Sequence, residues 1–194
     1  MKISSIKTLP IKTLTLALAA TALLLPTFSA TASTMPKPEV DRSSISLGLG
    51  PSFSIDGKIG PATSLGGSLG LPFLVEGGNS GRYDIRVTHR FLSQNRFTLS
   101  GIFGVWGNLR FDRPERSRYA GLELGVGLAY QFTPQLAGRL NIVPGIAFPF
   151  GSGRIVDYYP PAGGFELAYR FNNGLEGTLG YNGQGDILGL RFTI

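Results

Sequence analysis

The sequence predicts an all-β fold, a single antiparallel up-and-down β-barrel with no helix after the N-terminal leader. Three observations point to it. From Ser43 onward, hydrophobic residues recur at every second position, which is the side-chain period of a β-strand. Short turn-forming runs separate these alternating segments. The chain is 42% hydrophobic but only 15% charged, a composition that excludes a disordered or highly solvated helical protein.

The N-terminus reads as a secretory signal peptide covering residues 1–32. A basic start with three lysines precedes an apolar stretch from Leu14 to Leu25, and Ala30-Thr31-Ala32 fits the small-x-small cleavage pattern. The apolar stretch is too short to span a membrane as a helix. Because the leader carries three lysines and no acid, its removal lowers the net charge from +6 to +3. We therefore expect no nucleic-acid partner.

The rest of the chain reads as a short flexible lead, residues 33–42, followed by one barrel domain, residues 43–194. The chain has no Cys, so it has no disulfide and no thiol nucleophile. Its single histidine, His89, leaves no His-based metal cluster. We expect no catalytic residue, cofactor or metal site.

The clearest alternation runs through Tyr119–Phe132. Its even positions are hydrophobic, as at Leu122 and Leu124, and its odd positions are small or polar, as at Glu123 and Gly125. We expect Leu124→Arg to impair assembly and Gly125→Ser to be milder. The nine candidate strands are Ser43–Ile55, Ile59–Val75, Arg82–Leu92, Arg96–Phe111, Tyr119–Phe132, Gln135–Phe150, Gly164–Phe171, Leu175–Tyr181 and Asp186–Ile194.

Four connections of three residues, after Ile55, Leu92, Phe132 and Phe171, have a common hairpin length. Reflecting the chain across these turns places hydrophobic residues opposite each other, and such cross-strand pairs stabilise sheets. The predicted pairs are Phe91 with Phe97, Leu128 with Leu140, Val126 with Ile142, and Arg170 with Glu176. Arg170 and Glu176 are expected to form an ion pair without access to bulk water.

Nine strands cannot be the final count, because single-chain bacterial barrels have an even number. We expect eight strands, one candidate lying outside the wall; the alternative is ten, if residues 154–159 add a strand. The termini and tight turns should lie on the periplasmic side. Ser43–Ile55 contradicts that orientation, since as a single strand it would start outside.

The hydrophobic face is expected to point outward into lipid. The other face consists mostly of Gly, Ser, Ala and Thr with some Arg and Glu, which suits the crowded interior of a narrow barrel better than a wet surface. Outward aromatic residues also gather at the two ends of the strands, as in the interfacial belts of membrane proteins. The belts are Phe91, Phe97, Tyr130, Phe132, Tyr169, Phe171 and Phe192 near the tight turns, and Phe73, Tyr83, Phe111, Phe148, Phe150, Phe165 and Tyr181 at the opposite end.

In this architecture, Ser43–Ile194 resembles the small bacterial outer-membrane barrels of the OmpA/OmpX type. The final segment Gly189–Ile194 resembles their assembly signal, a glycine followed by hydrophobic residues at alternate positions. It departs from that signal in ending on Ile194 and in having Ile187 where a polar residue is usual. The resemblance implies a location in the cell outer membrane, contact with outer-membrane lipid, and recognition of the C-terminal strand by the barrel-assembly machinery.

The inward face is expected to carry a network of charges, because an isolated charge in a narrow lumen is costly. Its predicted members are Arg82, Asp84, Arg86, Arg90, Arg96, Arg110, Glu123, Arg139, Glu166, Arg170, Glu176 and Arg191. A network that closes the lumen favours a structural role in the envelope. The excess of arginines over acids in this set leaves a narrow anion-favouring pore as an alternative.

Two further alternatives stay open. With its apolar face inward, the chain would be a soluble periplasmic, lipocalin-like barrel that binds an apolar ligand. The most remote alternative is an enzyme that modifies lipid A, with its active site on the outer face of the barrel. His89 points outward by parity, but the sequence around it shows no hydroxyl nucleophile or orienting acid, so we interpret it as an interfacial residue. Trp106 is expected to fill the lumen.

Overall fold

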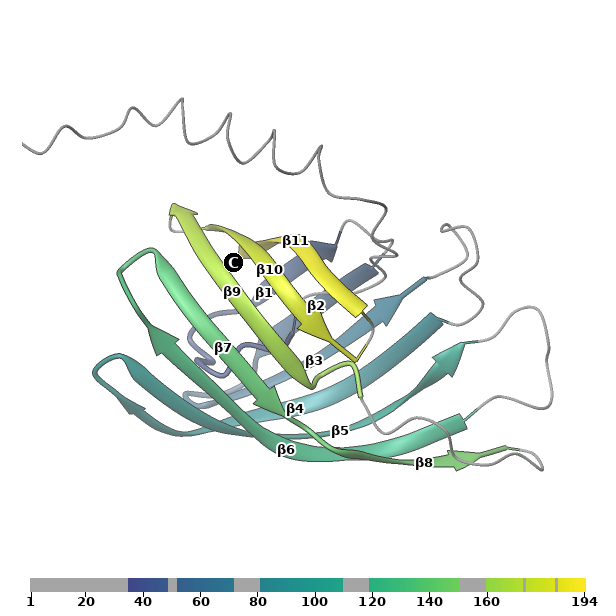
Figure 1. Ribbon diagram of the computed structural model, residues 1–194. Coiled ribbons are helices and arrows are strands. Elements are labelled where there is room, and N and C mark those ends of the chain that lie inside the picture. Colours follow the sequence, from purple (N-terminus) through teal and green to yellow (C-terminus); the bar gives the residue numbers. More distant parts are fainter. Residues whose placement is uncertain are drawn as a thin grey trace, which may run out of the picture.

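The computed structural model describes residues 35–48, 52–71, 81–109, 119–150, 160–172, 174–183 and 185–194. These residues form a closed, all-antiparallel barrel of ten strands (Figure 1). The predicted all-β antiparallel barrel is confirmed. Among the described residues, no helix is long and apolar enough to cross a membrane.

Eleven β-segments make up the ten strands. They are β1 Ser44–Gly48, β2 Ser52–Lys58, β3 Thr63–Gly70, β4 Gly81–Gln94, β5 Phe97–Leu109, β6 Tyr119–Gln131, β7 Leu136–Ile142, β8 Gly145–Pro149, β9 Gly164–Asn172, β10 Leu175–Asn182 and β11 Gly185–Thr193. β7 and β8 both pair with β6 and together count as one strand, interrupted at Val143-Pro144. Consecutive strands pair around the ring, and β1 pairs with β11 to close it.

The prediction of eight strands is wrong. The sequence predicts one strand over Ser43–Ile55, whereas this segment contains β1 and most of β2, which pair with each other from Ser44↔Asp56 to Gly48↔Ser52. The tenth strand therefore comes from this N-terminal hairpin; residues 154–159 lie outside the described part. An even count returns both chain ends to one side, where Ser44 pairs with Thr193. The contradiction in the orientation of Ser43–Ile55 is thereby removed.

The registers Leu128↔Leu140, Val126↔Ile142 and Arg170↔Glu176 are confirmed. The Phe91–Phe97 pair is wrong, because β4 and β5 join through a two-residue turn in which Asn95 has a positive φ of 53°. The register then shifts at Phe91, which is bulged out of the ladder between Arg90 and Leu92. The turn predicted after Ile55 is also misplaced, since Asp56-Gly57-Lys58 continue β2.

We call the end with the short turns of β4–β5 and β6–β7 the hairpin end, on the left of Figure 1, and the opposite end the loop end. Along the strands, one face is exposed and hydrophobic and the other is buried and mostly small, polar or charged. Leu124, for example, is 65% exposed whereas the neighbouring Glu123 is fully buried. Only a few large hydrophobic side chains are buried among the described residues: Met35, Val40, Ile102, Trp106, Val143 and Ile187.

Candidate functional site

The barrel interior holds a buried cluster of two arginines and two glutamates, the Arg139 cluster: Arg139, Arg191, Glu166 and Glu176. β7 and β11 supply the arginines, and β9 and β10 supply the acids. Arg139 Nη1 lies 2.7 Å from Glu166 Oε1, and Arg139 Nη2 lies 3.1 Å from Glu176 Oε2. Arg191 Nη1 lies 2.9 Å from the same Glu166 oxygen. Arg191 Nη1 also lies 3.4 Å from Glu176 Oε2, so each acid bridges two cations and the cluster ties four neighbouring strands together.

Residues 35–41, which we call the inner segment, run inside the barrel against this cluster. The Met35 amide donates to Glu166 Oε2 at 3.3 Å, and Arg191 donates to the Met35 carbonyl at 2.6 Å. Asn141 Nδ2 donates to the carbonyl of Pro36 at 3.1 Å. The sequence predicts a flexible lead at residues 33–42, whereas the structure packs residues 35–40 against the inner wall.

Two charged side chains of the inner segment join the network. Arg139 Nη2 lies 2.9 Å from Glu39 Oε1. Lys37 Nζ lies 2.8 Å from Asp41 and 3.8 Å from Glu176. Burial raises the pKa of the Glu39 carboxyl, but Arg139 and Lys37 outweigh burial and hold that pKa below its ordinary value.

Val40 adjoins these contacts with a φ of 44° and a side chain only 3% exposed. A β-branched residue in the left-handed region is strained and persists only where its surroundings determine it. The backbone of the inner segment is therefore held by its contacts with the wall.

A second buried group, the Arg86 cluster, consists of Arg86, Asp84 and Asp56. Arg86 Nη1 lies 2.5 Å from Asp84 Oδ2, and Arg86 Nη2 lies 3.0 Å from Asp56 Oδ1. Ser68 donates a hydrogen bond to the other Asp84 oxygen. This cluster links β2, β3 and β4 on the other side of the lumen.

Glu123 of β6 is buried with no hydrogen-bond partner for either carboxylate oxygen among the described residues. A Cβ added to Gly104 would lie 2.6 Å from Glu123 Oε1. Gly104 is therefore needed for the close approach of this carboxylate to β5. The structure places the predicted residue inside the lumen but without a partner in either cluster.

The remaining predicted charges are not members of the two clusters, although Arg170 contacts one acid of the Arg139 cluster. Arg82 donates to the carbonyl of Gly183, and Arg90 Nη1 donates to the carbonyl of Glu39 at 2.8 Å. Arg170 reaches Glu176 at 3.4 Å but its side chain is 37% exposed. Arg96 is exposed at the hairpin end, and Arg110 lies outside the described residues.

Sequence reasoning missed Asp56, Glu39 and Lys37. The sequence analysis places Asp56 in a turn, although it has the same parity as Ser52 and Ser54, and extending that alternation along β2 identifies it as an inward residue. Glu39 and Lys37 were missed because a Pro-rich lead gives no periodicity. With them, the described interior residues that are not exposed comprise seven cations and six acids, close to neutrality.

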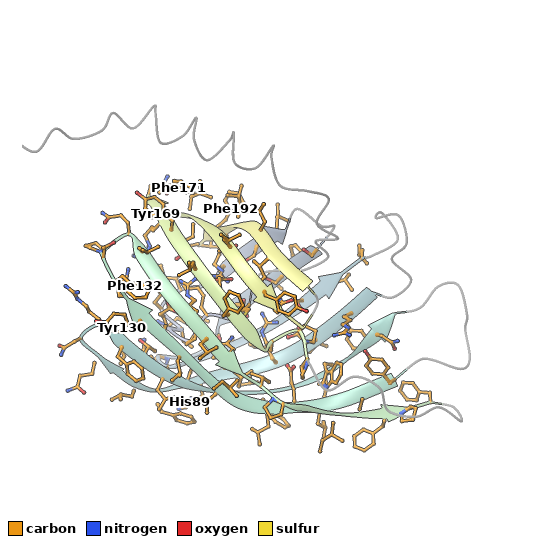
Figure 2. The ribbon with its side chains drawn as sticks, viewed as in Figure 1. His89, Tyr130, Phe132, Tyr169, Phe171 and Phe192 are labelled. Atoms are coloured by element: carbon orange, nitrogen blue, oxygen red, sulfur yellow. The ribbon has the colours of Figure 1, made fainter. Side chains whose placement is uncertain are left out.

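The aromatic residues lie on the outer face near the strand ends. Figure 2 shows Tyr130, Phe132, Tyr169 and Phe171 at the hairpin end; Phe91, Phe97 and Phe192 are at the same ends of β4, β5 and β11. At the loop end, Phe148, Phe150, Phe165 and Tyr181 are exposed and Tyr83 is half-buried. Phe73 and Phe111 lie outside the described residues.

His89 points outward, with its Nδ1 at 2.9 Å from the Thr63 hydroxyl on the neighbouring strand β3. Its ring also contacts Phe91 edge-on, with 5.3 Å between centroids. The hydroxyl neighbour was not evident from sequence, because it comes from a residue paired across the sheet. Within the part of the chain that the structure describes, no acidic side chain is hydrogen-bonded to His89. A base oriented for nucleophilic catalysis needs such a third group.

Trp106 is buried in the lumen, and its Nε1 donates to the Leu122 carbonyl at 3.3 Å. The described residues contain no group of three or more His, Asp or Glu side chains arranged to hold a metal ion. No protein-family model matches the chain, and a comparison with curated proteins found no similar sequence.

Proposed function

We propose that the chain is a bacterial outer-membrane β-barrel with a closed lumen and a structural role in the cell envelope. The observation that carries the proposal is the inverted burial. Large hydrophobic side chains are exposed on strand after strand around the ring, and charged side chains are buried inside. The largest apolar patch on a water-soluble monomer rarely exceeds a few hundred Å². A continuous apolar exterior on a closed barrel is stable only in contact with lipid.

The packing of the lumen supports closure. The Arg139 cluster and the inner segment occupy its hairpin half, and Arg86, Trp106 and Glu123 are all buried farther along. Arg139, Arg191 and Arg86 are at most 3% exposed. Buried ion pairs of this kind hold a conformation rigidly, since breaking one leaves a charge unpaired.

The alternatives receive less support. An anion-favouring pore needs an excess of positive charge, whereas the described interior residues that are not exposed comprise seven cations and six acids. A soluble barrel for an apolar ligand needs an apolar interior, whereas this interior is charged. An outer-wall enzyme would centre on the Thr63–His89 pair, for which no orienting acid is found among the described residues.

The C-terminal strand supports the proposed recognition of the chain by the barrel-assembly machinery. Leu190 and Phe192 of β11 both point outward and are exposed, at alternate positions before the chain end. This arrangement resembles the assembly signal of outer-membrane barrels, from which the chain departs in ending on Ile194. Export through a signal peptide at residues 1–32 belongs to the same proposal.

Cell fractionation and planar-bilayer recording test the two parts of the proposal. The chain should be found in outer membranes and should change its gel migration on heating, as stable barrels do. The purified protein should show no steady conductance. Lys37→Met with Glu39→Gln should increase channel openings, with exposed Arg42→Gln as the control. Recovery in the soluble periplasm would contradict the membrane location, and steady anion-selective currents from the wild type would contradict closure.

A further inference from the structure

A cavity of about 740 Å³ lies in the barrel wall where β7 gives way to β8. The β7–β9 ladder ends at Asn141↔Gly164. Pro144 has no amide hydrogen, and beyond it β8 pairs with β6. Over the described residues, β8 therefore has no paired strand on its other side. The residues that line the cavity include Asn141, Ile142, Val143, Pro144, Pro160 and Tyr181.

The lining comes from both faces of the wall. Ile142 and Tyr181 belong to the outer face and are 55% and 52% exposed. Their chain neighbours Asn141 and Asn182 also line the cavity, but they belong to the inner face and are buried. Since neighbouring residues of a strand point to opposite faces, the cavity extends from the hydrophobic exterior towards the lumen.

The polar side chains at the inner end of the cavity are already bonded within the protein. Asn141 Nδ2 donates to the carbonyls of Pro36 and Ala162, each at 3.1 Å. Arg82 donates to the Gly183 carbonyl, and both Arg82 and Asn182 have further interactions with the protein. These side chains close the inner end of the cavity, and a ligand would be recognised by the apolar part of the lining.

A buried hydrophobic cluster adjoins that apolar part. Val143, which lines the cavity, packs with Ile102 and Ala162, and all three are at most 6% exposed. The interior elsewhere is mostly small, polar or charged. Together with Pro144 and Pro160, the cluster gives the cavity an apolar wall at the place where the strand pairing of the barrel is interrupted.

We propose that this cavity takes up one alkyl chain of a membrane lipid. The chain enters from the exterior past Ile142 and Tyr181 and ends against Val143 and Pro160, while the head group stays outside. An apolar cavity excludes water and takes up apolar molecules. The inference rests on the proposed function, because the mouth opens onto the face proposed to contact lipid. The volume is within the ordinary range for sites that hold small molecules.

Trp106 provides a reporter for the inner end of the cavity. It is the only tryptophan of the chain, and it is buried inside the barrel. A Cβ added to Gly145 would lie 2.5 Å from Pro160 Cγ and 2.7 Å from Trp106 Nε1. The indole therefore adjoins a residue of the cavity lining, whereas the strands of the wall separate it from lipid that stays outside.

Tryptophan fluorescence of the purified protein in nanodiscs tests the proposal. The nanodiscs contain phosphatidylcholine with bromine near the methyl end of its acyl chains, and bromine quenches an indole only at short range. We expect brominated lipid to lower the Trp106 emission by about half relative to the same lipid without bromine, because the end of the chain fills the apolar cavity beside the indole. Phosphatidylglycerol brominated at the same position should quench equally, since the head group takes no part in recognition.

Two variants that narrow the cavity should remove most of this quenching. Ile142→Phe enlarges a residue of the mouth on the outer face, and Val143→Phe fills the inner end. Leu140→Phe is the matched control, because Leu140 is an exposed residue on the same face of β7 that does not line the cavity. It should be quenched as the wild type is. Heat-dependent gel migration identifies the variants that keep the barrel, and if Val143→Phe does not, Ile142→Phe decides.

Dissolved iodide distinguishes an alkyl chain from water in the cavity. We expect iodide to quench Trp106 less than brominated lipid does. Absence of quenching by brominated lipid, equal quenching in the wild type and Ile142→Phe, or stronger quenching by iodide overturns the proposal. A clear preference for the anionic lipid also overturns it. Fractionation tests the membrane location independently, so an outer-membrane protein whose Trp106 is not quenched refutes only this inference.

Discussion

Arg139 Nε donates a hydrogen bond to Glu39 Oε1 at 3.0 Å, although the two residues lie 100 positions apart. Glu39 belongs to the inner segment and Arg139 to the wall strand β7, so this contact fastens the segment inside the barrel. The same guanidinium also pairs with Glu166 and Glu176. Arg139 therefore contacts both the inner segment and the acids of the interior cluster, as Arg191 does through the Met35 carbonyl and Glu166.

Replacing Arg139 with Met should lower the free energy of unfolding by about 3–5 kcal/mol, because three acids then lose a buried partner. The exposed Arg96→Met should change it by less than about 0.5 kcal/mol. Both free energies of unfolding should be measured by urea titration of the protein in lipid vesicles, with gel migration as the readout of folding. Equal midpoints for the two variants would show that the Arg139 cluster does not hold the barrel together.

A double-mutant cycle on Arg170 and Glu176 should give a coupling energy of no more than about 1 kcal/mol. The sequence predicts a pair without access to water, but Arg170 is more than a third exposed and Glu176 keeps Arg139, Arg191 and Lys37 nearby. The matching cycle on Arg139 and Glu166 should give a larger coupling, because both side chains are buried. A larger coupling for the Arg170 pair would contradict this assignment.

Leu124→Arg should prevent or slow membrane assembly, at a cost of about 2–4 kcal/mol, since position 124 points outward. Leu124→Met is the apolar control and should assemble normally. Gly125→Ser is not the mild change that the sequence suggests. Its Cβ would meet the Ile142 carbonyl and come within 2.5 Å of Val143 Cα, both backbone atoms. Assembly into lipid vesicles should therefore fail or slow for Gly125→Ser too; normal assembly would contradict the tight packing of β6 on β7.

Gly101→Ala should destabilise the barrel because the bulged Phe91 ring lies over this glycine. A Cβ at position 101 would lie 2.8 Å from Phe91 Cε2. The ring is the end of a flexible side chain, so the loss should stay below about 2 kcal/mol. The loss of stability caused by Gly101→Ala should nearly disappear when Phe91 is also replaced with Ala, as measured by unfolding midpoints. An unchanged loss in the Phe91→Ala variant would show that the added methyl group clashes with another residue.

Acidification should remove the contribution of Glu39 to stability. Its folded-state pKa is lowered from the ordinary value of 4.5, so the stabilisation is fully present above pH 4.5 and is lost as the pH falls through the lower folded value. The difference in unfolding midpoint between wild type and Glu39→Gln should accordingly be constant near neutral pH and shrink below pH 4.5. A difference that grows on acidification would contradict the ion pair with Arg139.

The alternation of hydrophobic and polar residues is enough to predict the fold class and the two faces of the strands. The alternation at Leu122, Glu123 and Leu124 depends only on the two-residue period of an extended chain, so it can be recognised from the sequence without knowledge of the tertiary structure. The same period put Arg139, Glu166 and Glu176 on one face before their contacts were known. The positions of turns follow less directly from this period than the faces of strands do. A turn wrongly predicted at Asp56 is the reason that one acid of the Arg86 cluster is missed.

The strand count and the place of the inner segment depend on contacts between residues that are distant in sequence. The count depended on whether Ser43–Ile55 reverses direction, and closure against β11 decides that, since both partners of β1 must be satisfied. Lys37 and Glu39 lie in a segment without any periodic pattern of hydrophobic residues. Ion pairs with charged residues on strands distant in sequence hold them inside the barrel. Arg82 reaches Gly183 across the ring for the same reason: long-range pairing follows from closure of the barrel, and no local pattern encodes it.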